Sequence, residues 1–272
     1  MLREIGGVLT YKIVYVLSMI TFLVLALWLC HRRKIPLRVG VALGLCYIWG
    51  MNTGARMLYD LFNHRFHLLN YFDPGYYMQP GLWGGPLAYL AVATVGTLVL
   101  ARDKRGVLDL IVLTLPLPMI VAKVACFVNG CCYGAPCSLP WAVTFPEGGE
   151  YYTAPPGVSR HPTQLYEIVV LGAIQVVLVV LDRKRWRGLL MAWFVMLYGI
   201  GRPLAEFFRA AEKRNVVIGP LTLSEAVCLT GALLAGVVLM IARHRLAANP
   251  SFRSDKNNPD PPEQLPTRCT PG

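Results

Sequence analysis

The sequence predicts an all-α integral membrane protein with about seven transmembrane helices, its N-terminus outside and its C-terminus in the cytoplasm. Only 15% of the 272 residues are charged, whereas a soluble protein averages about 25%. Long apolar runs recur along the chain, which is typical of membrane spans. These runs are continuous and do not alternate with a period of two, so they favour helices over a membrane β-barrel.

Each span needs about 20 apolar residues. The expected helices occupy residues 9–30, 37–59, 81–101, 107–128, 162–182, 187–208 and 220–242. The first run lacks a small-residue cleavage site and is followed by HRRK, so we interpret it as a retained helix and not as a cleaved signal peptide. Residues 1–246 then form one transmembrane domain. Residues 247–272 are rich in Pro and Asn and have no apolar periodicity, which predicts a disordered cytoplasmic tail.

The basic residues set the predicted orientation. Sixteen of the 26 Lys and Arg residues lie in four segments, which follow the first, third, fifth and seventh spans. With seven spans these segments share one side of the membrane, and the positive-inside rule makes that side cytoplasmic. The net charge of +11 is therefore explained by topology, and we expect the lipid bilayer and no nucleic acid as a partner.

A polar cluster, RHPTQLYE, opens the fifth span at residues 160–167. Pro162 is tolerated in the first helical turn, so we expect the helix to begin there. Gln164 and Glu167 are three residues apart and share a helical face, with His161 three residues before Gln164. An ordinary capped helix end is the alternative, but it would not require both Gln164 and Glu167 to face inward.

The sixth span carries a second cluster in the segment MLYGIGRPLAEFFRA. Tyr198, Arg202, Glu206 and Arg209 are spaced four, four and three residues apart, so they form one stripe along the helix. Charges within a membrane are costly and usually face the bundle interior, which makes them candidates for function. A structural Arg–Glu pair that joins two helices is the alternative, and it does not exclude a function.

Cations from several helices are expected near the outer leaflet. They are Arg56, Lys123, His161, Arg202 and Arg209. For Lys123 alone, snorkelling to the interface is an equal alternative. Such an excess of positive charge suggests an anion, and lipid phosphate is the anion at hand. Arginine suits phosphate because its planar fork can bind two oxygens at once.

Four of the eight cysteines gather in the segment CFVNGCCYGAPC. These are Cys126, Cys131, Cys132 and Cys137. Their gaps are unlike the pairs two to four residues apart that are typical of zinc sites. A disulfide is plausible on the outer side, with partners left open. No basic partner is adjacent in sequence, so we assign these cysteines no catalytic role.

Four segments together resemble the bacterial prolipoprotein diacylglyceryl transferases. RHPTQLYE resembles the family hallmark RHPSQLYE, and YGIGRPLAEFFR resembles the segment YGxxRxxxEFFR. NTGARMLYDLF is similar to the family's Gly-Gly-Arg motif, and FVNGCCYG is similar to FINGxxxG. The motifs occur in the family's order, and the resemblance covers the chain to about residue 245.

The resemblance implies an enzyme of the bacterial cytoplasmic (inner) membrane whose active site faces the outer leaflet. Such an enzyme moves the diacylglyceryl group of phosphatidylglycerol to the lipobox cysteine thiol of a prolipoprotein signal peptide. A thioether forms and glycerol phosphate leaves, and no cofactor or metal is implied. Substitution at carbon by a thiolate requires a deprotonated thiol and a neutralised phosphate leaving group.

The resemblance also implies roles for individual residues. Arg202 would bind the developing phosphate charge, and Tyr198 and Glu206 would orient it. The residues implied as the wall and the headgroup pocket are Arg160, His161, Gln164, Tyr166, Glu167, Asn129 and Gly130, with Arg56, Lys123 and Arg209 as further cations.

The chain departs from the family at three positions. Gln79 stands where the family has a histidine, and glutamine cannot act as a base near neutral pH. Lys123 replaces an arginine, which keeps the charge and loses the fork. Cys126 replaces an asparagine. His161 or Glu167 remains as a candidate base, and His64 and His67 are weaker candidates.

The departures leave an alternative, which is a non-catalytic or altered-specificity phospholipid-binding paralogue on the same scaffold. A small-anion transporter is a third hypothesis that rests only on the intramembrane charges. The lack of a recognisable internal repeat in the sequence counts against it.

Overall fold

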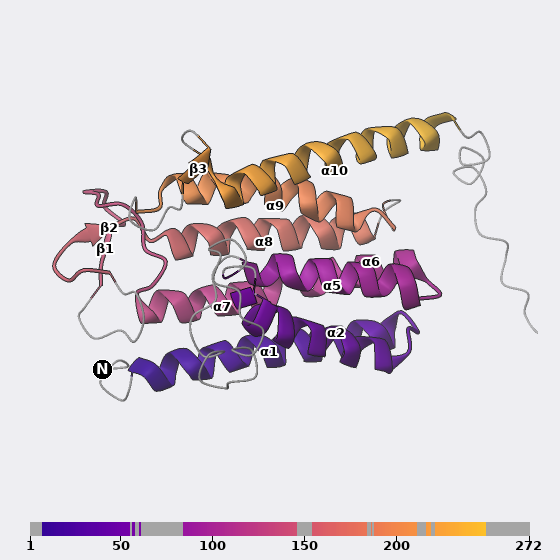
Figure 1. The fold of residues 1–272 in the computed structure, drawn as a ribbon, viewed down its shortest axis with the longest axis horizontal. Helices are drawn as coiled ribbons and strands as arrows, with labels where there is room; N and C mark the ends of the chain where they lie inside the picture. The colour runs from indigo at the N-terminus through magenta and orange to yellow at the C-terminus, as the bar shows by residue number, and fades with distance from the viewer. Residues whose placement is uncertain are drawn as a thin grey trace, which may run out of the picture.

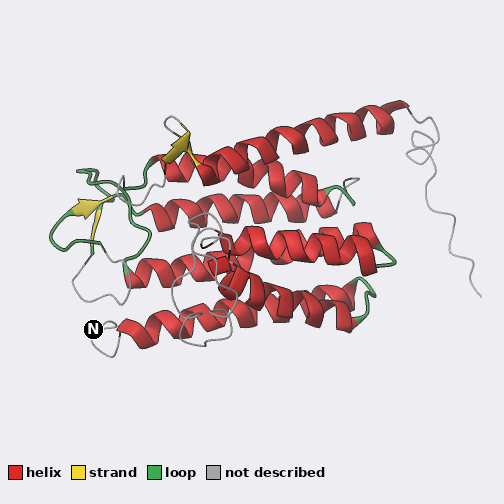
Figure 2. Ribbon diagram, viewed as in Figure 1, coloured by secondary structure: helices red, strands yellow, loops and turns green. Residues whose placement is uncertain are grey.

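The computed structural model describes residues 7–54, 56–57, 60, 84–145, 154–183, 186, 188–210, 216–218 and 221–248. Within these residues the chain is mostly helical (Figures 1 and 2). Three residues to which the sequence points, His64, His67 and Gln79, lie outside this part of the chain, as do residues 249–272 of the expected tail.

Helices account for nearly all of the regular structure. They are α1 (Gly7–Arg32), α2 (Leu37–Trp49), the π-helical turn η1 (Gly50–Gly54), α5 (Gly84–Leu100), α6 (Lys104–Thr114), α7 (Pro116–Asn129), α8 (Thr163–Asp182), α9 (Leu190–Phe207) and α10 (Leu223–Ala248). Two short antiparallel strand pairs accompany them. They are β1 (Val143–Thr144) with β2 (Ser159–Arg160), and β3 (Val216–Ile218) with β4 (Leu221–Thr222).

The span expected at residues 107–128 lies within the candidate membrane span Lys104–Asn129, which α6 and α7 form together with only Leu115 between them. The break lies at Pro116, since proline has no N–H to donate to the preceding turn. Gln175 of α8 donates to the carbonyl oxygen of Leu113 at 3.4 Å, beside the break.

Two smaller differences concern the chain outside the spans. The expected all-α architecture also contains the two strand pairs, which are too short to leave a pattern in the sequence. Helix α10 continues to Ala248, two residues into the segment that we expected to be disordered from residue 247.

The helices lie side by side with their long axes roughly aligned (Figure 1). Helix α1 packs against α2 and α7, and the order of contact then runs from α7 through α8 and α9 to α10. Strands β1 and β2 and their loops gather at one end of the bundle, where α7 ends and α8 begins (Figure 2).

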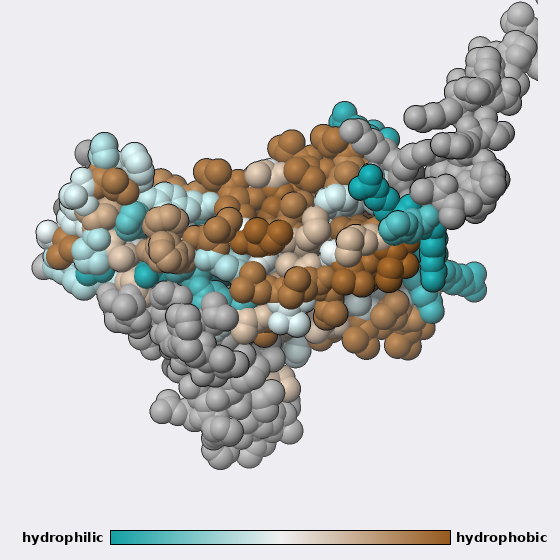
Figure 3. Space-filling view, turned by 90° about the horizontal axis from the view of Figure 1, so that it is seen from above, coloured by the Kyte–Doolittle hydropathy of each residue, from teal (hydrophilic) through white to brown (hydrophobic). Residues whose placement is uncertain are grey.

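Among the described residues, four segments are long and apolar enough to cross a membrane. They are Tyr11–Arg32, Lys104–Asn129, Thr163–Asp182 and Ser224–Arg245. Apolar side chains cover the visible flank of the helices, and hydrophilic ones lie at its two ends (Figure 3). Val169, Leu204 and Leu233 are 70%, 61% and 73% exposed. Apolar surface on this scale requires a lipid environment.

Close helix contacts depend on small residues. At Gly50 an added Cβ would lie 2.7 Å from the backbone nitrogen of Tyr89, so η1 and α5 approach within backbone contact. At Gly199 a Cβ would collide with the carbonyl oxygen of Cys228, which sets the contact between α9 and α10. Small residues allow such packing in membranes, where the hydrophobic effect does not drive helices together.

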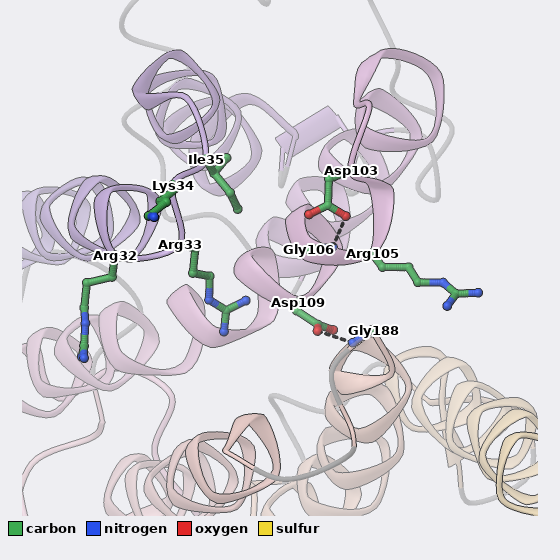
Figure 4. A pocket seen from close by; sticks show the side chains of 9 residues that line it. All are labelled: Arg32, Arg33, Lys34, Ile35, Asp103, Arg105, Gly106, Asp109 and Gly188. Carbon is green, nitrogen blue, oxygen red and sulfur yellow. Dashed lines mark hydrogen bonds between the residues drawn. The ribbon is translucent and has the colours of Figure 1, made fainter. Parts of the chain in front are cut away.

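A buried carboxylate fixes the start of α9. Asp109 of α6 is 2% exposed and accepts hydrogen bonds from the backbone N–H groups of Gly188 and Leu190, the second at 3.0 Å. The contact with Gly188 is drawn in Figure 4. The first N–H groups of a helix have no partner within the helix, and Asp109 supplies one from a helix elsewhere in the chain.

Replacing Asp109 with alanine should therefore destabilise the bundle. Loss of an acceptor for two buried N–H groups predicts a decrease of about 2 kcal/mol in the free energy of unfolding. Thermal unfolding of the detergent-solubilised protein would measure it. Asp103→Ala is the control, because Asp103 accepts only an exposed cap bond from Gly106, and its loss should cost about 1 kcal/mol. An equal effect of the two substitutions would contradict this account of α9.

Candidate functional site

Three segments meet at the end of the bundle that carries β1 and β2 (Figure 1). They are the end of α7 with the loop after it, the start of α8, and the end of α9. Hydrogen bonds join their backbones: Gly134 N–H donates to His161 O at 3.0 Å, His161 N–H to Ala135 O at 3.0 Å, and Ala135 N–H to Phe208 O at 2.9 Å. The loop after α7 therefore lies between α8 and α9.

Gly134 occupies the centre of this junction. An added Cβ there would lie 2.5 Å from the Cβ of His161 and 2.6 Å from the carbonyl oxygen of Phe208. Both neighbours are held by the backbone and could not move aside. Only glycine allows the three segments to approach this closely.

The first turn of α8 holds the loop through its side chains. The Thr163 hydroxyl donates to the carbonyl oxygen of Cys132 at 2.5 Å, and the Gln164 amide donates to that of Cys131 at 2.6 Å. Gln164 is fully buried, as its inward position on the sequence pattern predicts. Helix α8 begins at Thr163, one residue after the expected start at Pro162.

Five charged side chains form a continuous network beneath this junction. Glu167 of α8 contacts Lys123 of α7 at 2.7 Å through one oxygen and Arg202 of α9 at 3.1 Å through the other. Arg202 contacts Glu206 at 2.7 Å, and Arg209 contacts Glu206 at 3.1 Å. We call these five residues the ion network; it joins three helices.

The ion network is largely removed from solvent. Arg202 is 6% exposed, Glu167 is 6% exposed and Glu206 is 3% exposed. Its three cations and two carboxylates carry a net charge of +1. Burying charge is costly even when it is paired, so an unbalanced positive charge here favours a bound anion.

A second polar chain lies beside the ion network. The Trp141 indole N–H donates to the Tyr166 hydroxyl at 2.8 Å, and that hydroxyl is 3.0 Å from His161 Nδ1. The His161 ring also lies against Phe208, with 5.1 Å between the ring centroids. His161 thus sits among aromatic side chains at the edge of the junction, in contact with Tyr166 and Phe208.

Two other residues of the site are buried. Arg160, the last residue of β2, is 6% exposed and lies over the Tyr133 ring, with 4.8 Å from its guanidinium carbon to the ring centroid. Asn129, at the end of α7, is 3% exposed. Gly130 follows it with φ of +73° and caps the helix through its N–H group.

The structure brings together most of the residues that the sequence singles out. The expected stripe on α9 is present, since Arg202, Glu206 and Arg209 are linked by ion pairs. Tyr198 lies one turn before Arg202 and stacks on Phe194, with 5.5 Å between centroids. Arg56 pairs with Asp60 at 3.3 Å.

Sequence reasoning missed three features of the site. Trp141 was not singled out, although tryptophan is common at membrane interfaces. Thr163 lies within the hallmark segment but was given no role. The third feature is a cluster of thiols: the Sγ atoms of Cys126, Cys131 and Cys132 all lie within 4.8 Å of one another.

A cavity of about 520 Å³ lies at the opposite end of the bundle, near the ends of α1 and α5 (Figure 4). Arg32, Arg33, Lys34 and Arg105 are among its lining residues. No residue of the ion network lines it, so we treat it separately from the candidate site.

Comparison with known proteins identifies the family of this chain. The sequence model described as prolipoprotein diacylglyceryl transferase matches residues 2–242. Three curated relatives are each named phosphatidylglycerol–prolipoprotein diacylglyceryl transferase. The relative from Nitratidesulfovibrio vulgaris is 31% identical over 222 residues, covering 76% of this chain and 77% of its own.

The relative from Geobacter sulfurreducens is 28% identical over 231 residues, covering 79% and 83% of the two chains. The relative from Rhodospirillum rubrum is 28% identical over 266 residues, covering 90% and 92%. With a match across nearly its whole length, this chain belongs to the prolipoprotein diacylglyceryl transferase family.

Proposed function

We propose that this protein transfers the diacylglyceryl group of phosphatidylglycerol to the lipobox cysteine thiol of prolipoproteins. The observation that carries the proposal is the buried ion network with its net charge of +1. A phosphodiester anion would neutralise that charge. The names of the relatives give the two substrates for proteins that are similar to this one.

The proposed reaction exchanges one bond for another. The bond between the glyceryl carbon and the phosphate oxygen breaks, and a bond between that carbon and the cysteine sulfur forms. Glycerol phosphate leaves with the electron pair, and the thiol proton passes to a base. The site must therefore stabilise negative charge on the phosphate and accept one proton.

Arg202 is the proposed ligand of the leaving phosphate. It lies at the centre of the ion network, where Glu167 and Glu206 orient its guanidinium group. Its fork can hold two phosphate oxygens. Lys123 and Arg209 would add positive charge on either side, and Tyr198 would line the same helical stripe.

His161 is the proposed base. Both oxygens of Glu167 contact a cation, so a proton on Glu167 would have to displace an ion pair. The His161 ring is bound to Tyr166 through Nδ1, which orients the ring at the edge of the junction. We therefore propose His161, and not Glu167, of the two candidates that the sequence leaves open.

The remaining site residues are proposed to surround the headgroup. Asn129 and Gly130 end α7, and Arg160 and Gln164 flank the start of α8. Arg56 and Gln79 are proposed as further substrate-binding residues.

The proposed topology has seven spans and places this site in the outer leaflet of the bacterial cytoplasmic membrane. Four of the described segments are long and apolar enough to cross a membrane. The other three spans would be α2 together with η1, α5, and α9. Basic residues Arg32, Arg33 and Lys34 lie at the end of the bundle opposite to the ion network. The positive-inside rule assigns their end to the cytoplasm.

A phospholipid-binding paralogue without catalysis is the second candidate. Gln79 and Lys123 favour it, since they replace a histidine and an arginine of the family motifs. It shares the phosphate site with the first candidate and lacks turnover. Saturable binding of phosphatidylglycerol without release of glycerol phosphate would establish this second function and exclude the first.

Substitution of Arg202 tests the proposed phosphate site. We expect Arg202→Lys to lower the release of glycerol phosphate from phosphatidylglycerol and a lipobox peptide by about 100-fold or more, because charge remains and the fork is lost. The double variant Arg202→Gln with Glu206→Gln, which leaves no Glu206 charge unpaired, should be equally impaired. Arg243→Ala, at an exposed position of α10, is the control. Full turnover in a folded Arg202 variant would refute the role of this side chain.

Substitution of His161 tests the proposed base through a pH profile. We expect His161→Gln to lower kcat/KM by about 100-fold at pH 7. The defect should shrink as the pH rises through about 8.5, where the peptide thiol ionises without help. Tyr166→Phe, which removes only the hydroxyl bound to the ring, should reduce the rate less. A defect of His161→Gln that is the same at every pH would show that the residue is not the base.

A further inference from the structure

Three thiols meet beside the ion network. The Sγ atoms of Cys126, Cys131 and Cys132 all lie within 4.8 Å of one another. Cys131 is buried, and Cys126 and Cys132 are half-buried. All three are free cysteines. We call these three residues the thiol cluster; Cys137, the fourth cysteine of this segment, lies outside it.

The backbone is specifically shaped to make this cluster. After α7 the chain turns through Gly130 with φ of +73° and through Cys132 with φ of +60°. Only Lys34 and Cys132 have a positive φ among the described non-glycine residues, and such a conformation is costly for a residue with a side chain. The two turns bring Cys131 and Cys132 back toward Cys126. The three sulfur atoms therefore lie close together, although Cys126 is five residues before Cys131.

Hydrogen bonds from α8 hold the cluster in place. Thr163 and Gln164 bind the carbonyl oxygens of Cys132 and Cys131, and the N–H of Cys131 donates to the carbonyl oxygen of Cys126 at 3.1 Å. The ligand backbone is therefore fixed by partners that are not themselves thiols, as in metal sites whose outer partners orient the ligands.

Positively charged side chains lie near the cluster. Lys123 is three residues before Cys126 on the same helix face. Arg209 pairs with Gly134 on the adjacent backbone. Arg209 and Lys123 both lie close enough to the Cys132 thiol to interact with its charge.

From this geometry we propose that Cys126, Cys131 and Cys132 bind one thiophilic d¹⁰ metal ion, Zn²⁺ or Cu⁺. Thiolates select these metals over hard cations. A Zn–S bond of about 2.3 Å in tetrahedral geometry separates sulfur atoms by about 3.8 Å, so small side-chain rotations would close the cluster onto an ion. Three thiolates leave the fourth position of Zn²⁺ to water or an added ligand.

The neighbouring charges fit such an ion. Zn²⁺ with three thiolates would carry a net charge of −1, and the Lys123 and Arg209 side chains lie nearby. Binding replaces thiol protons by the metal and releases them to solvent. The spacing of the cysteines in the sequence favoured no metal site, because it does not show that three of the sulfur atoms approach one another in space. The proposed site revises that expectation. It does not depend on the transferase activity, because metal content is measured without substrate.

Metal content of the purified protein tests the proposal. The full chain, reduced and freed of metal in detergent, would be titrated with Zn²⁺, with Cu⁺ under anaerobic conditions, and with Mg²⁺. We expect one equivalent of Zn²⁺ or Cu⁺ and none of Mg²⁺, with proton release on binding; competition between the first two names the metal. Titration with Co²⁺ should give thiolate-to-metal charge-transfer absorption.

Two variants and a matched control locate the site. Loss of a residue that only orients a metal ligand typically lowers the metal affinity by about 10- to 100-fold. We expect Cys126→Ser and Cys132→Ser each to lower the affinity for the metal by more than this, because each removes a ligand. Cys137→Ser should bind as the unmodified chain does. Protection of the three thiols from alkylation by bound metal checks the same point in the unmodified protein, so a misfolded variant cannot decide the result.

Two results would overturn the proposal. One is a reduced protein that binds no equivalent of either metal while the three thiols remain open to alkylation. The other is a disulfide between two of the three cysteines, found in protein whose free thiols were alkylated in the intact expressing cells before purification. Neither result bears on turnover of lipid, so this proposal and the proposed function can fail separately.

Discussion

The contact between Arg202 and two carboxylates, one on its own helix and one on α8, is the interaction on which the candidate site depends. Arg202 reaches Glu167 at 3.1 Å and Glu206 at 2.7 Å, and Lys123 joins from α7. A single charge at the bilayer centre costs about 3 kcal/mol on insertion scales, so five of them can remain only where each has a partner. The network therefore fixes α7, α8 and α9 relative to one another.

The proposed chemistry of the site depends on the same interaction. Paired charges satisfy one another, but three cations with two carboxylates leave one positive charge without a counterpart inside the network. A bound phosphodiester would complete the balance and would be held where its charge increases during transfer. Stabilising the leaving phosphate away from water is a form of electrostatic preorganisation, which makes the largest contribution to the rate enhancement of many enzymes.

The loop after α7 connects this network to the rest of the junction. Gly134 allows three backbones to meet, and Thr163 and Gln164 bind the carbonyl oxygens beside the thiols. The residues of the hallmark segment thus have two tasks. Glu167 pairs with cations of the ion network, while Thr163 and Gln164 bind the loop that carries Cys131 and Cys132.

The sequence predicts what is local. The spacing of Arg202, Glu206 and Arg209 repeats with the helix, so their shared stripe could be recognised from the chain alone. The burial of Gln164 and Glu167 followed from the same periodicity. The break between α6 and α7 also has a local cause, because Pro116 and Pro118 interrupt the apolar run in the sequence.

Contacts between distant segments could not be predicted in this way. Lys123 and Glu167 belong to different helices, and only the packing of α7 on α8 shows that they pair. The convergence of Cys126 with Cys131 and Cys132 depends on a left-handed turn at Cys132, a conformation that a cysteine does not signal. Trp141 reaches Tyr166 from the segment just before strand β1, far from it in the sequence.

Complementation tests the central claim, that the ion network is the phosphate site of a working transferase, most directly. The protein would be expressed in cells depleted of their own diacylglyceryl transferase, with lipoprotein modification followed by gel shift. The account predicts restored modification by the unmodified chain and none by Arg202→Ala present in the membrane at the same level. Absence of restored modification by the unmodified chain, or modification that persists in the Arg202→Ala variant, would contradict it.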